Sequence, residues 1–538
     1  MNNDLQNVAI TQNFEEKASL KTGRTGGLPY VGSGWYRTSF DTPADKEVTL
    51  LFDGAMSEAR VYVNGKEACF WPFGYNSFHC NVTPFLNKNG KSNTLAVRLE
   101  NRPQSSRWYP GAGLYRNVHL IVTDRIHVPV WGTQITTPHV SKEFAAVRLQ
   151  TRIDNAGEKT QIRMETEILS PDGKVVTRKE NTGRINHGQP FEQNFIVNAP
   201  ELWSPESPSL YKAVSKIYAD NKLVDTYTTR FGIRSIEYIA DKGFYLNGKH
   251  RKFQGVCNHH DLGPLGAAIN VAALRHQLTL LKDMGCDAIR TSHNMPAPEL
   301  VKACDEMGMM LMAESFDEWN KAKCANGYNL IFDEWVEKDL VNLVHHYRNN
   351  PSVVMWCVGN EVPNQWDESG CKISRFLQDI CHREDPTRPV TQGMDAPDAV
   401  VNNNMAAVMD VAGFNYRPFR YQVNYKKLPQ QIILGSETAS TVSSRGVYKF
   451  PVERKAMAVY EDHQSSSYDV EHCNWSNLPE DDFIQHEDLP YCIGEFVWTG
   501  FDYLGEPTPY YTNWPSHSSL FGIIDLAGIP KDRYYAIP

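Results

Sequence analysis

Three features are scarce or missing in this chain of 538 residues. It contains no run of about 18 apolar residues, so no transmembrane helix is expected. The 11 cysteines are scattered without a CxxC pair, which argues against a disulfide framework and a zinc site. The start, MNNDLQNVAITQNF, lacks the apolar core of a signal peptide. We therefore predict a cytoplasmic protein, or a periplasmic or secreted one whose signal peptide has been removed.

The charge and the aromatic content restrict the partners. A net charge of −9 provides no general attraction for nucleic acid or for anionic membranes, so neither is an expected partner. Aromatic residues make up 11% of the chain, with 12 Trp and 25 Tyr. Such rings fill β-rich cores, and they also stack on the apolar faces of sugars. Composition alone favours the first explanation, and the length predicts about three domains.

The first 236 residues are predicted to form two β domains. Residues 1–125 contain short strand-like runs separated by turn signals, among them EVTLLFDG, ARVYVNGKEACF and NTLAVRLEN. Asn64 and Gly65 indicate a tight hairpin, and the whole pattern predicts a jelly roll. Residues 126–236 again alternate as strands, over the size of an immunoglobulin-like β-sandwich.

After residue 237, strand-like runs alternate with helical patterns. Val271, Leu274, Leu278 and Leu281 are spaced as on one face of a helix. The predicted strands are KFQGV, CDAIRTS, GMMLMAES, SVVMWCVGNE, PVTQG, DVAGFNY, QIILGSE and GEFVWTG. Eight such units over residues 237–538 predict a (β/α)8 TIM barrel. The chain ends about where the last barrel helix is expected to start, so we expect the barrel to be truncated at its C-terminal end.

Polar residues follow most of these strands at their C-terminal ends, where TIM-barrel active sites lie. So much polarity on one rim would need mutual pairing, which favours a functional site over unrelated buried polar groups. The residues concerned are Asn258, His259, His260, Asp261, Arg290, Thr291, Ser292, His293, Asn294, Glu314, Ser315, Asn360, Glu361, Asn415, Tyr416, Ser436, Glu437, Trp498 and Asp502.

Glu361 and Glu437 follow the fourth and seventh predicted strands and can face each other across the barrel mouth. Glycoside hydrolysis needs such a pair, with one carboxyl protonated as the acid and the other ionised as the nucleophile. Facing carboxylates raise each other's proton affinity and titrate as a unit. Arg290 and Tyr416 are suitable partners to keep one of them ionised. The alternative is that Glu361 only caps the helix near Pro363.

Other residues at these ends are candidates for sugar contacts. Asn360 can hydrogen-bond a sugar hydroxyl, and Trp498 can lie beneath the sugar ring or plug the barrel. His259, His260 and His293 also suggest a metal hydrolase, but neighbouring His side chains in an extended chain point in opposite directions. The HxH and HExxH spacings are absent near them. We therefore predict no metal and no cofactor, and expect the histidines to bind or orient sugar hydroxyls.

At these residues the chain resembles glycoside hydrolase family 2, the β-galactosidase and β-glucuronidase group. GWYRTSFD, VYVNG and SSRWYPGAGLYRNV look like its N-terminal sugar-binding jelly roll, and FGIRSIEY looks like the exit from its immunoglobulin-like domain. GVCNHHDLG, AIRTSHNMPAPELVKACDEMGMMLMAES, RNNPSVVMWCVGNE, GSETAS and VWTGFDYLGEP look like its barrel. The resemblance therefore spans nearly the whole chain.

The resemblance implies a retaining mechanism, with Glu361 matching the acid/base and Glu437 the nucleophile. Tyr416 matches the tyrosine that hydrogen-bonds the nucleophile, and Asp261 falls where many members carry a sugar-contacting residue. Arg107 and Trp108 lie on the N-terminal-domain loop that reaches the active site in relatives. The predicted substrate-binding residues are Asp261, His293, Asn360, Tyr416, Trp498, Arg107, Trp108, His260 and Asp502.

The resemblance also bears on the sugar. Family glucuronidases grip the substrate carboxylate with a late Asn-x-Lys motif, which FGIIDLAGIPKD lacks; residues 320–323, NKAK, lie much earlier and do not substitute for it. Family mannosidases differ around both glutamates. HHDLG, GSETAS and WTGFDYLGEPTPY look like the galactosidase branch. We therefore expect exo-acting removal of terminal β-D-galactose from small or oligosaccharide β-galactosides.

Several alternatives stay open at this point. A well-known bacterial β-galactosidase has an aspartate near the loop where this chain has Ser106, Arg107 and Trp108, so modified or linked galactosides are candidate substrates. The same chemistry on β-glucuronides or β-mannosides is a second hypothesis. A catalytically impaired carbohydrate-binding fragment is a third. Assembly into a homo-oligomer is also left open.

Overall fold

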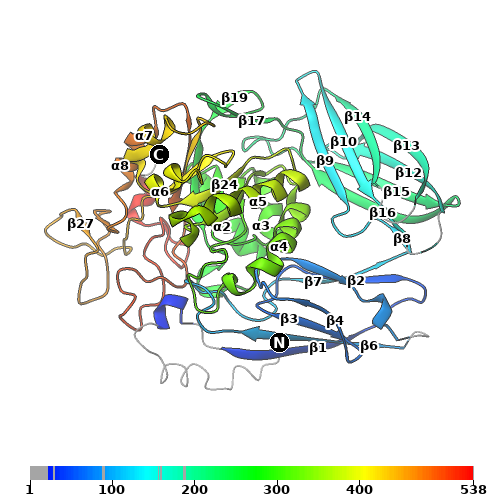
Figure 1. Ribbon diagram of the computed structural model, residues 1–538, viewed down its shortest axis with the longest axis horizontal. Coiled ribbons are helices and arrows are strands. Elements are labelled where there is room, and N and C mark those ends of the chain that lie inside the picture. Colours follow the sequence, from blue (N-terminus) through cyan, green and yellow to red (C-terminus); the bar gives the residue numbers. More distant parts are fainter. Residues whose placement is uncertain are drawn as a thin grey trace.

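Two β-rich domains and a TIM barrel make up the computed structural model (Figure 1). It describes residues 22–27, 31–87, 91–155, 157, 160–185 and 190–536. The N-terminal run MNNDLQNVAITQNF, on which the signal-peptide prediction rests, lies outside the described residues. Jelly roll, immunoglobulin-like sandwich and barrel follow one another along the chain, as the sequence predicts.

The N-terminal domain packs two antiparallel sheets against each other. Val48, Leu50 and Phe52 alternate with more exposed residues and are buried between the sheets, because successive side chains of a strand face opposite sides. Asn64 and Gly65 both have positive φ and form the predicted hairpin turn. One sheet has the order β1 (Gly32–Phe40), β6 (Asn93–Asn101), β3 (Ala59–Val63), β4 (Lys66–Trp71), and the other β5 (Phe78–Asn81), β2 (Glu47–Phe52), β7 (Val118–Thr123).

The second domain is also a sandwich of antiparallel sheets. Val147, Leu149 and Phe195 form part of its buried core. Arg234, at its exit, donates hydrogen bonds to the backbone oxygens of Pro351 and Val353 and so attaches the domain to the barrel. The sheets are β14 (Pro190–Asn198), β10 (Phe144–Arg152), β9 (Thr133–Val140), then β13 (Val175–Ile185), β12 (Thr160–Leu169), β15 (Tyr211–Ala219), β16 (Lys222–Phe231), and the pair β11 (Asp154–Asn155), β8 (Ile126–His127).

Eight parallel strands close the barrel, and each overlaps a run predicted from the sequence. The last strand pairs with both the seventh and the first, so the sheet has no open edge. The strands are β20 (Phe253–Asn258), β21 (Ala288–Thr291), β22 (Met310–Glu314), β23 (Val353–Asn360), β24 (Val390–Met394), β25 (Ala412–Asn415), β26 (Ile433–Thr438) and β29 (Cys492–Trp498). A meander of β17 (Ile236–Ile239), β18 (Gly243–Leu246) and β19 (Lys249–Arg251) precedes them.

Helices cover the outside of the barrel, and the first of them contains the four residues at predicted helical spacing. Leu274, Leu278 and Leu281 are buried, whereas Val271 is 48% exposed. Val271 is the first residue of this helix, directly after the Asn270 cap, and lies beyond the packed turns. The helices are α2 (Val271–Asp283), α3 (Pro298–Met307), α4 (Phe332–Tyr347), α5 (Glu368–Glu384), α6 (Pro397–Asn402), α7 (Tyr421–Tyr425) and α8 (Pro479–His486). No helix of the described residues is long and apolar enough to span a membrane.

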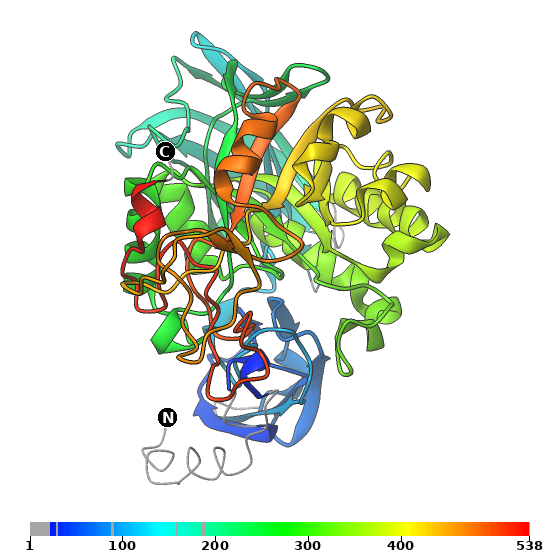
Figure 2. The same ribbon diagram turned by 90° about the vertical axis from the view of Figure 1, so that its left-hand side faces the viewer.

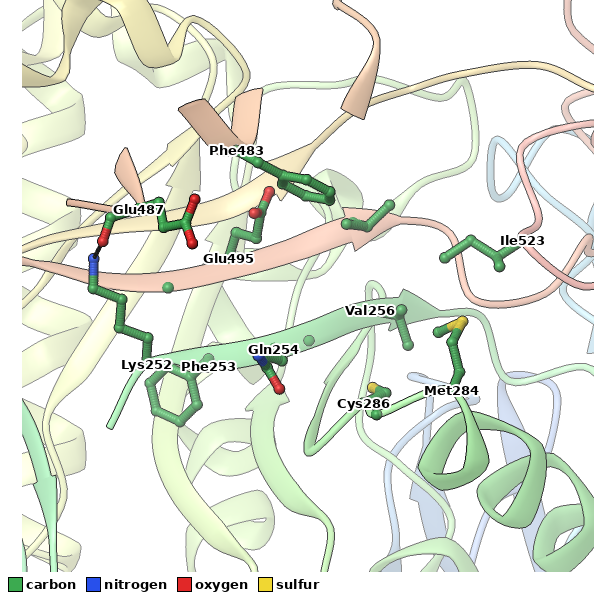
Figure 3. Close-up of a pocket in the computed structure, with 14 residues that line it drawn as sticks. Lys252, Phe253, Gln254, Val256, Met284, Cys286, Phe483, Glu487, Glu495 and Ile523 are labelled. Atoms are coloured by element: carbon green, nitrogen blue, oxygen red, sulfur yellow. Dashed lines mark hydrogen bonds between the residues drawn. The ribbon is translucent and has the colours of Figure 1, made fainter. Parts of the chain in front are cut away.

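Between β20 and β29, the outer face of the barrel holds a cavity of about 190 Å³. Figure 3 shows Val256 of β20, Glu495 of β29 and Phe483 of α8 around it. Lys252 donates hydrogen bonds to the backbone oxygens of Glu487 and Leu489 at its edge. The cavity thus lies beside the seam at which β20 and β29 close the barrel sheet.

The remaining elements are short and lie mainly in loops. Some of these loops contact the N-terminal domain. Figure 2 shows that domain (blue) beside the late barrel loops (orange and red). The backbone of Tyr109 donates a hydrogen bond to Leu504 there. The short elements are η2 (Thr22–Thr25), η3 (Thr83–Phe85), η4 (Gly263–Leu265), η5 (Tyr328–Leu330), η6 (Pro363–Trp366), η7 (Pro418–Arg420), η8 (Asp532–Tyr535), β27 (Lys455–Ala456) and β28 (Glu471–His472).

Candidate active site

Glu361 and Glu437 both lie at the C-terminal ends of barrel strands. Glu361 directly follows β23, whose eight residues are all buried, and Glu437 lies in β26 with 4% exposure. Glu361 has a φ of 44°, and its backbone N–H donates to the Gly393 oxygen at 2.8 Å. The N-cap of the following η6 is Val362, without a side-chain cap bond. The helix-capping alternative for Glu361 is therefore wrong.

One amide nitrogen joins the two carboxylates. Asn415 Nδ2 lies 3.0 Å from Glu361 Oε1 and 3.4 Å from Glu437 Oε2. Glu437 also accepts from the Tyr416 hydroxyl at 2.6 Å and from Arg290 Nη1 at 3.1 Å. Arg290 and Tyr416 thus both contact Glu437, and the structure brings the two glutamates into one hydrogen-bonded group.

Burial dominates the electrostatics of this pair. It raises the pKa of Glu437 to about 8, with a further rise from the charge of Glu361, while Arg290 and Tyr416 act in the opposite direction. Burial also raises the pKa of Glu361, followed by the charge of Asp395. Because each carboxylate raises the pKa of the other, the pair holds one proton near neutral pH.

Arg290 links the strand ends around the glutamates. Its fully buried guanidinium donates to Glu314, to Asn360 Oδ1 at 2.8 Å and to the Ser436 oxygen at 2.9 Å, in addition to Glu437. A buried guanidinium needs such partners because an unpaired buried charge is costly. Arg290 therefore fixes the relative positions of β21, β22, β23 and β26.

His293 and Trp498 form one wall beside this group. Their rings stack with centroids 5.2 Å apart, and His293 Nδ1 lies 2.7 Å from Glu314 Oε1. Asn360 Nδ2 lies 3.3 Å from His293 Nε2. Burial lowers the pKa of His293 well below its usual value, so the ring is neutral at pH 7. The predicted His293, Asn360 and Trp498 are therefore neighbours.

The N-terminal-domain loop reaches this wall, as expected for Arg107 and Trp108. Arg107 makes a bidentate ion pair with Asp317 at 2.8 and 3.1 Å. Trp108 is buried, and its ring centroid lies 4.8 Å from that of His259 and 5.6 Å from that of His293. Two separate domains thus contribute to one site.

The structure places His260, Asp261 and Asp502 elsewhere. His260 Nε2 lies 3.1 Å from the Pro110 oxygen, and its ring packs on Tyr75 of the N-terminal domain. His259 instead faces the site, because adjacent side chains of an extended segment point in opposite directions. Of these two histidines, His259 thus packs against Trp498 and His260 against the N-terminal domain, and a substrate contact of either stays a prediction.

The two aspartates have structural partners. Asp261 Oδ2 accepts the backbone N–H groups of Gly263 and Leu504 at 3.2 and 3.3 Å. Asp502 forms a buried ion pair with Lys531 at 2.7 Å and accepts the Gly522 N–H. The described contacts of Asp261 and Asp502 thus brace loops, and they do not reach either glutamate.

Two side chains of the site were missed by sequence reasoning. Asp317 accepts from Asn360 Nδ2 at 3.0 Å, and Lys323 Nζ lies 2.8 Å from Asp317 and 2.7 Å from the Asn360 backbone oxygen. Both follow β22, so their place after a strand end was the available signal.

Comparisons with known proteins agree with the architecture that carries this site. The family model described as "Glycosyl hydrolases family 2, TIM barrel domain" matches residues 238–511, and "Glycosyl hydrolases family 2" matches residues 128–234. "Beta-galactosidase BoGH2A" of Bacteroides ovatus is 38% identical over 98% of this chain and 67% of its own length. A "Putative beta-glucuronidase" of Formosa agariphila is 32% identical over 99% of this chain and 52% of its own.

A solved structure has the same architecture. The crystal structure of a glycosyl hydrolase family 2 member from Bacteroides cellulosilyticus superposes with a TM-score of 0.85 and 32% identity, over 96% of this chain and 63% of that chain. The chain thus spans between 52% and 67% of the length of these three relatives.

Proposed function

Because the chain belongs to glycosyl hydrolase family 2, we propose that it acts as an exo-acting retaining glycosidase that removes terminal β-D-galactose. The observation that carries this proposal is the pair of glutamates held by Asn415. Glu437 is the nucleophile and Glu361 the acid/base. The substrate is a small or oligosaccharide β-galactoside.

Hydrogen bonding supports this division of roles. Glu437 accepts from a guanidinium, a phenol and an amide, whereas Glu361 accepts from the Asn415 amide. Burial and the charge of Glu361 raise the pKa of Glu437 to about 8, but hydrogen bonds to the charged form favour that form, and on this ground we assign the negative charge of the pair to Glu437. The shared proton then resides on Glu361, which can donate it.

The reaction follows in two steps. Glu437 attacks the anomeric carbon while the bond to the glycosidic oxygen breaks, and that oxygen takes the proton of Glu361. Water then attacks the glycosyl-enzyme, gives its proton to Glu361 and releases Glu437 as a carboxylate. Two inversions at the anomeric carbon retain its configuration.

The spacing of the carboxylates supports a retaining mechanism. The accepting oxygens of Glu361 and Glu437 lie 3.0 and 3.4 Å from the same nitrogen, so their separation cannot exceed the sum of these distances. Inverting enzymes need about 6.5 Å or more to admit a water between the carboxyls, whereas retaining enzymes need about 5 Å. Two carboxylates whose nearest oxygens share one nitrogen fit the closer, retaining arrangement.

We assign sugar contacts to the wall beside the glutamates. Trp498 supplies an apolar face beneath the ring, and His293, Asn360 and Trp108 border it. Arg107 reaches the same place from the N-terminal domain. His260, Asp261 and Asp502 receive no substrate contact, because their described partners are structural.

A β-glucuronide is the second candidate substrate. The Formosa agariphila relative named a putative β-glucuronidase, which matches 99% of this chain, favours it. Two observations weigh against it: the late Asn-x-Lys motif is absent, and the nearby cations Arg107 and Lys323 are already paired with Asp317. Galactose remains the proposal.

A panel of aryl glycosides tests the sugar, and Glu437→Ala tests the nucleophile. We expect turnover of the aryl β-galactoside above that of the β-glucuronide and β-mannoside. Glu437→Ala should lower kcat/KM by at least about 10⁴-fold, and azide should restore turnover by forming an α-galactosyl azide. Unchanged activity in this variant contradicts the proposal. Sugar binding without hydrolysis by the unaltered chain indicates a carbohydrate-binding protein instead.

A further inference from the structure

Lys323 contacts the backbone directly before Glu361. Its Nζ lies 2.7 Å from the Asn360 oxygen and 2.8 Å from Asp317 Oδ1, and its side chain is 12% exposed. An ammonium group that donates to a backbone oxygen fixes the position of that peptide. Lys323 therefore holds the point at which β23 ends and Glu361 begins.

The turn at Glu361 needs such support. A φ of 44° is a left-handed conformation, which is disfavoured for a residue with a side chain. The turn persists because its peptide groups are held from outside. Gly393 accepts the Glu361 N–H, Arg290 donates to the Asn360 side chain, and Lys323 donates to the Asn360 backbone oxygen.

Lys323 is itself held by a braced loop. Glu318 accepts the backbone N–H groups of Lys323, Cys324 and Asn329. A Cβ added at Gly327 would come within 1.8 Å of Glu318 Oε1, so the loop closes tightly over this carboxylate. The ammonium group of Lys323 is therefore delivered to Asn360 from a preorganised segment.

Asp317 connects Lys323 to the rest of the site. It accepts from Arg107, Lys323 and Asn360 Nδ2. Although burial opposes it, the charges of Arg107 and Lys323 hold the pKa of Asp317 well below its usual range. Lys323 thus contacts the Asn360 backbone directly and is linked to the Asn360 side chain through Asp317.

We propose that Lys323 is a positioning residue of the reaction, which holds the turn at Asn360 and Glu361 and thereby the acid/base carboxyl. This inference rests on the function proposed above. It predicts two effects of removing the ammonium group: a displaced acid/base and a changed electrostatic environment.

The direction of the electrostatic effect follows from the charges that face Glu361. Burial raises the pKa of Glu361 most, and Asp395 after β24 raises it further, whereas Lys323 and Arg107 lower it. Glu437 on β26 is a further negative neighbour, and Asn415 and Tyr416 on β25 face the same group. Loss of the Lys323 charge raises the pKa of Glu361, so the acid keeps its proton to higher pH.

The test compares Lys323→Met with Lys321→Met. Lys321 lies two residues away, is 45% exposed and pairs with Asp367 on the surface. For Lys323→Met we expect the alkaline limb of kcat/KM to move up by about half a pH unit or more. The kcat for an alkyl galactoside should fall about tenfold, with KM nearly unchanged. The kcat for a dinitrophenyl galactoside should fall much less, since its leaving group needs no proton. Lys323→Arg should recover part of the loss.

Several outcomes decide the proposal. If Lys323→Met and Lys321→Met show the same alkaline limb and the same dependence on the leaving group, the proposal is overturned. If Lys323→Met does not fold, as judged by its thermal melting, Lys323→Gln is held to the same criteria. Glu361→Gln separates the two hypotheses: if it loses the alkaline limb while Lys323→Met matches the unaltered protein, only the role of Lys323 fails. If Glu361→Gln retains that limb, the proposed acid/base fails as well.

Discussion

Glu437 is a carboxylate on which burial and hydrogen bonding act in opposite directions. Burial raises its pKa to about 8, and the hydrogen bond from Tyr416 and the charge of Arg290 lower it. Tyr416 also has positive φ, at 59°, and its own N–H donates to the Glu437 backbone oxygen. The side chain and the backbone of Tyr416 thus hold the same residue.

At the residue scale, we predict the effect of Tyr416→Phe. The change removes a donor that stabilises the ionised form of Glu437, so the pKa of the pair rises and the acidic limb of the pH–rate profile moves to higher pH. A hydrogen bond to a charged group is worth about 1.5–3 kcal/mol, so kcat/KM should fall about 10- to 100-fold. Tyr448→Phe is the control, because this tyrosine is exposed and its hydroxyl donates to Asp532 of η8. An acidic limb at the same pH in both variants would contradict the role of Tyr416.

At the scale of elements, β24 shows how a strand makes room for the site. A Cβ added at Gly393 would come within 2.7 Å of Asn415 Oδ1, 2.8 Å of Arg290 Nη2 and 3.0 Å of Asn360 Oδ1. All three side chains belong to the network that holds the glutamates. Gly393 is therefore needed for space, so that side chains of neighbouring strands can meet across it.

Gly393→Ala tests whether β24 needs a glycine at this position. Overpacking typically costs about 1–3 kcal/mol, so we expect a comparable loss in the free energy of unfolding. Displacement of Arg290 and Asn360 should lower kcat/KM about tenfold or more. The matched control is Gly34→Ala in β1, where nothing lies within 4 Å of the added Cβ. Equal activity of the two variants would show that the network tolerates the methyl group.

At the scale of the whole molecule, the site depends on contact between the N-terminal domain and the barrel. Arg107 pairs with Asp317 of the barrel, and Trp71 Nε1 donates to Asp339 of α4 at 2.9 Å. Arg116 adds a buried hydrogen bond to the Met295 oxygen at 3.0 Å. The jelly roll is thus attached beside the proposed catalytic glutamates and also along the barrel wall.

Arg107→Ala removes the attachment beside the glutamates and leaves the attachment along the barrel wall in place. It leaves Asp317 with Lys323 as its remaining cation, so we expect a loss of up to about 3 kcal/mol in stability. Since Arg107 also borders the proposed sugar site, kcat/KM should fall about 10- to 100-fold. Arg60→Ala removes an exposed pair with Glu67 in the same domain and should change both measurements little. If kcat/KM of Arg107→Ala equals that of the control, the contact between the domains is not part of the active site.

Local patterns in the sequence predicted the fold class and the strands of the barrel. Each strand is a short apolar run between turn signals, and the place of Glu361 and Glu437 after their strands follows from that order alone. The rule that barrel sites lie at the C-terminal strand ends then brought both glutamates to one rim. Helical spacing placed Val271 in its helix but does not reveal where the packed turns begin, so its exposure came only from the structure.

The sequence by itself thus determined the order of domains, the barrel strands and the candidate glutamates, because these depend on short-range periodicity and chain order. Only the tertiary structure decided that His259 rather than His260 faces the site, that Asp502 pairs with Lys531, and that Lys323 reaches Asn360. These contacts join segments far apart in the chain. Which side chains meet depends on how the barrel closes and how the loops pack over its end, and no local pattern contains that information.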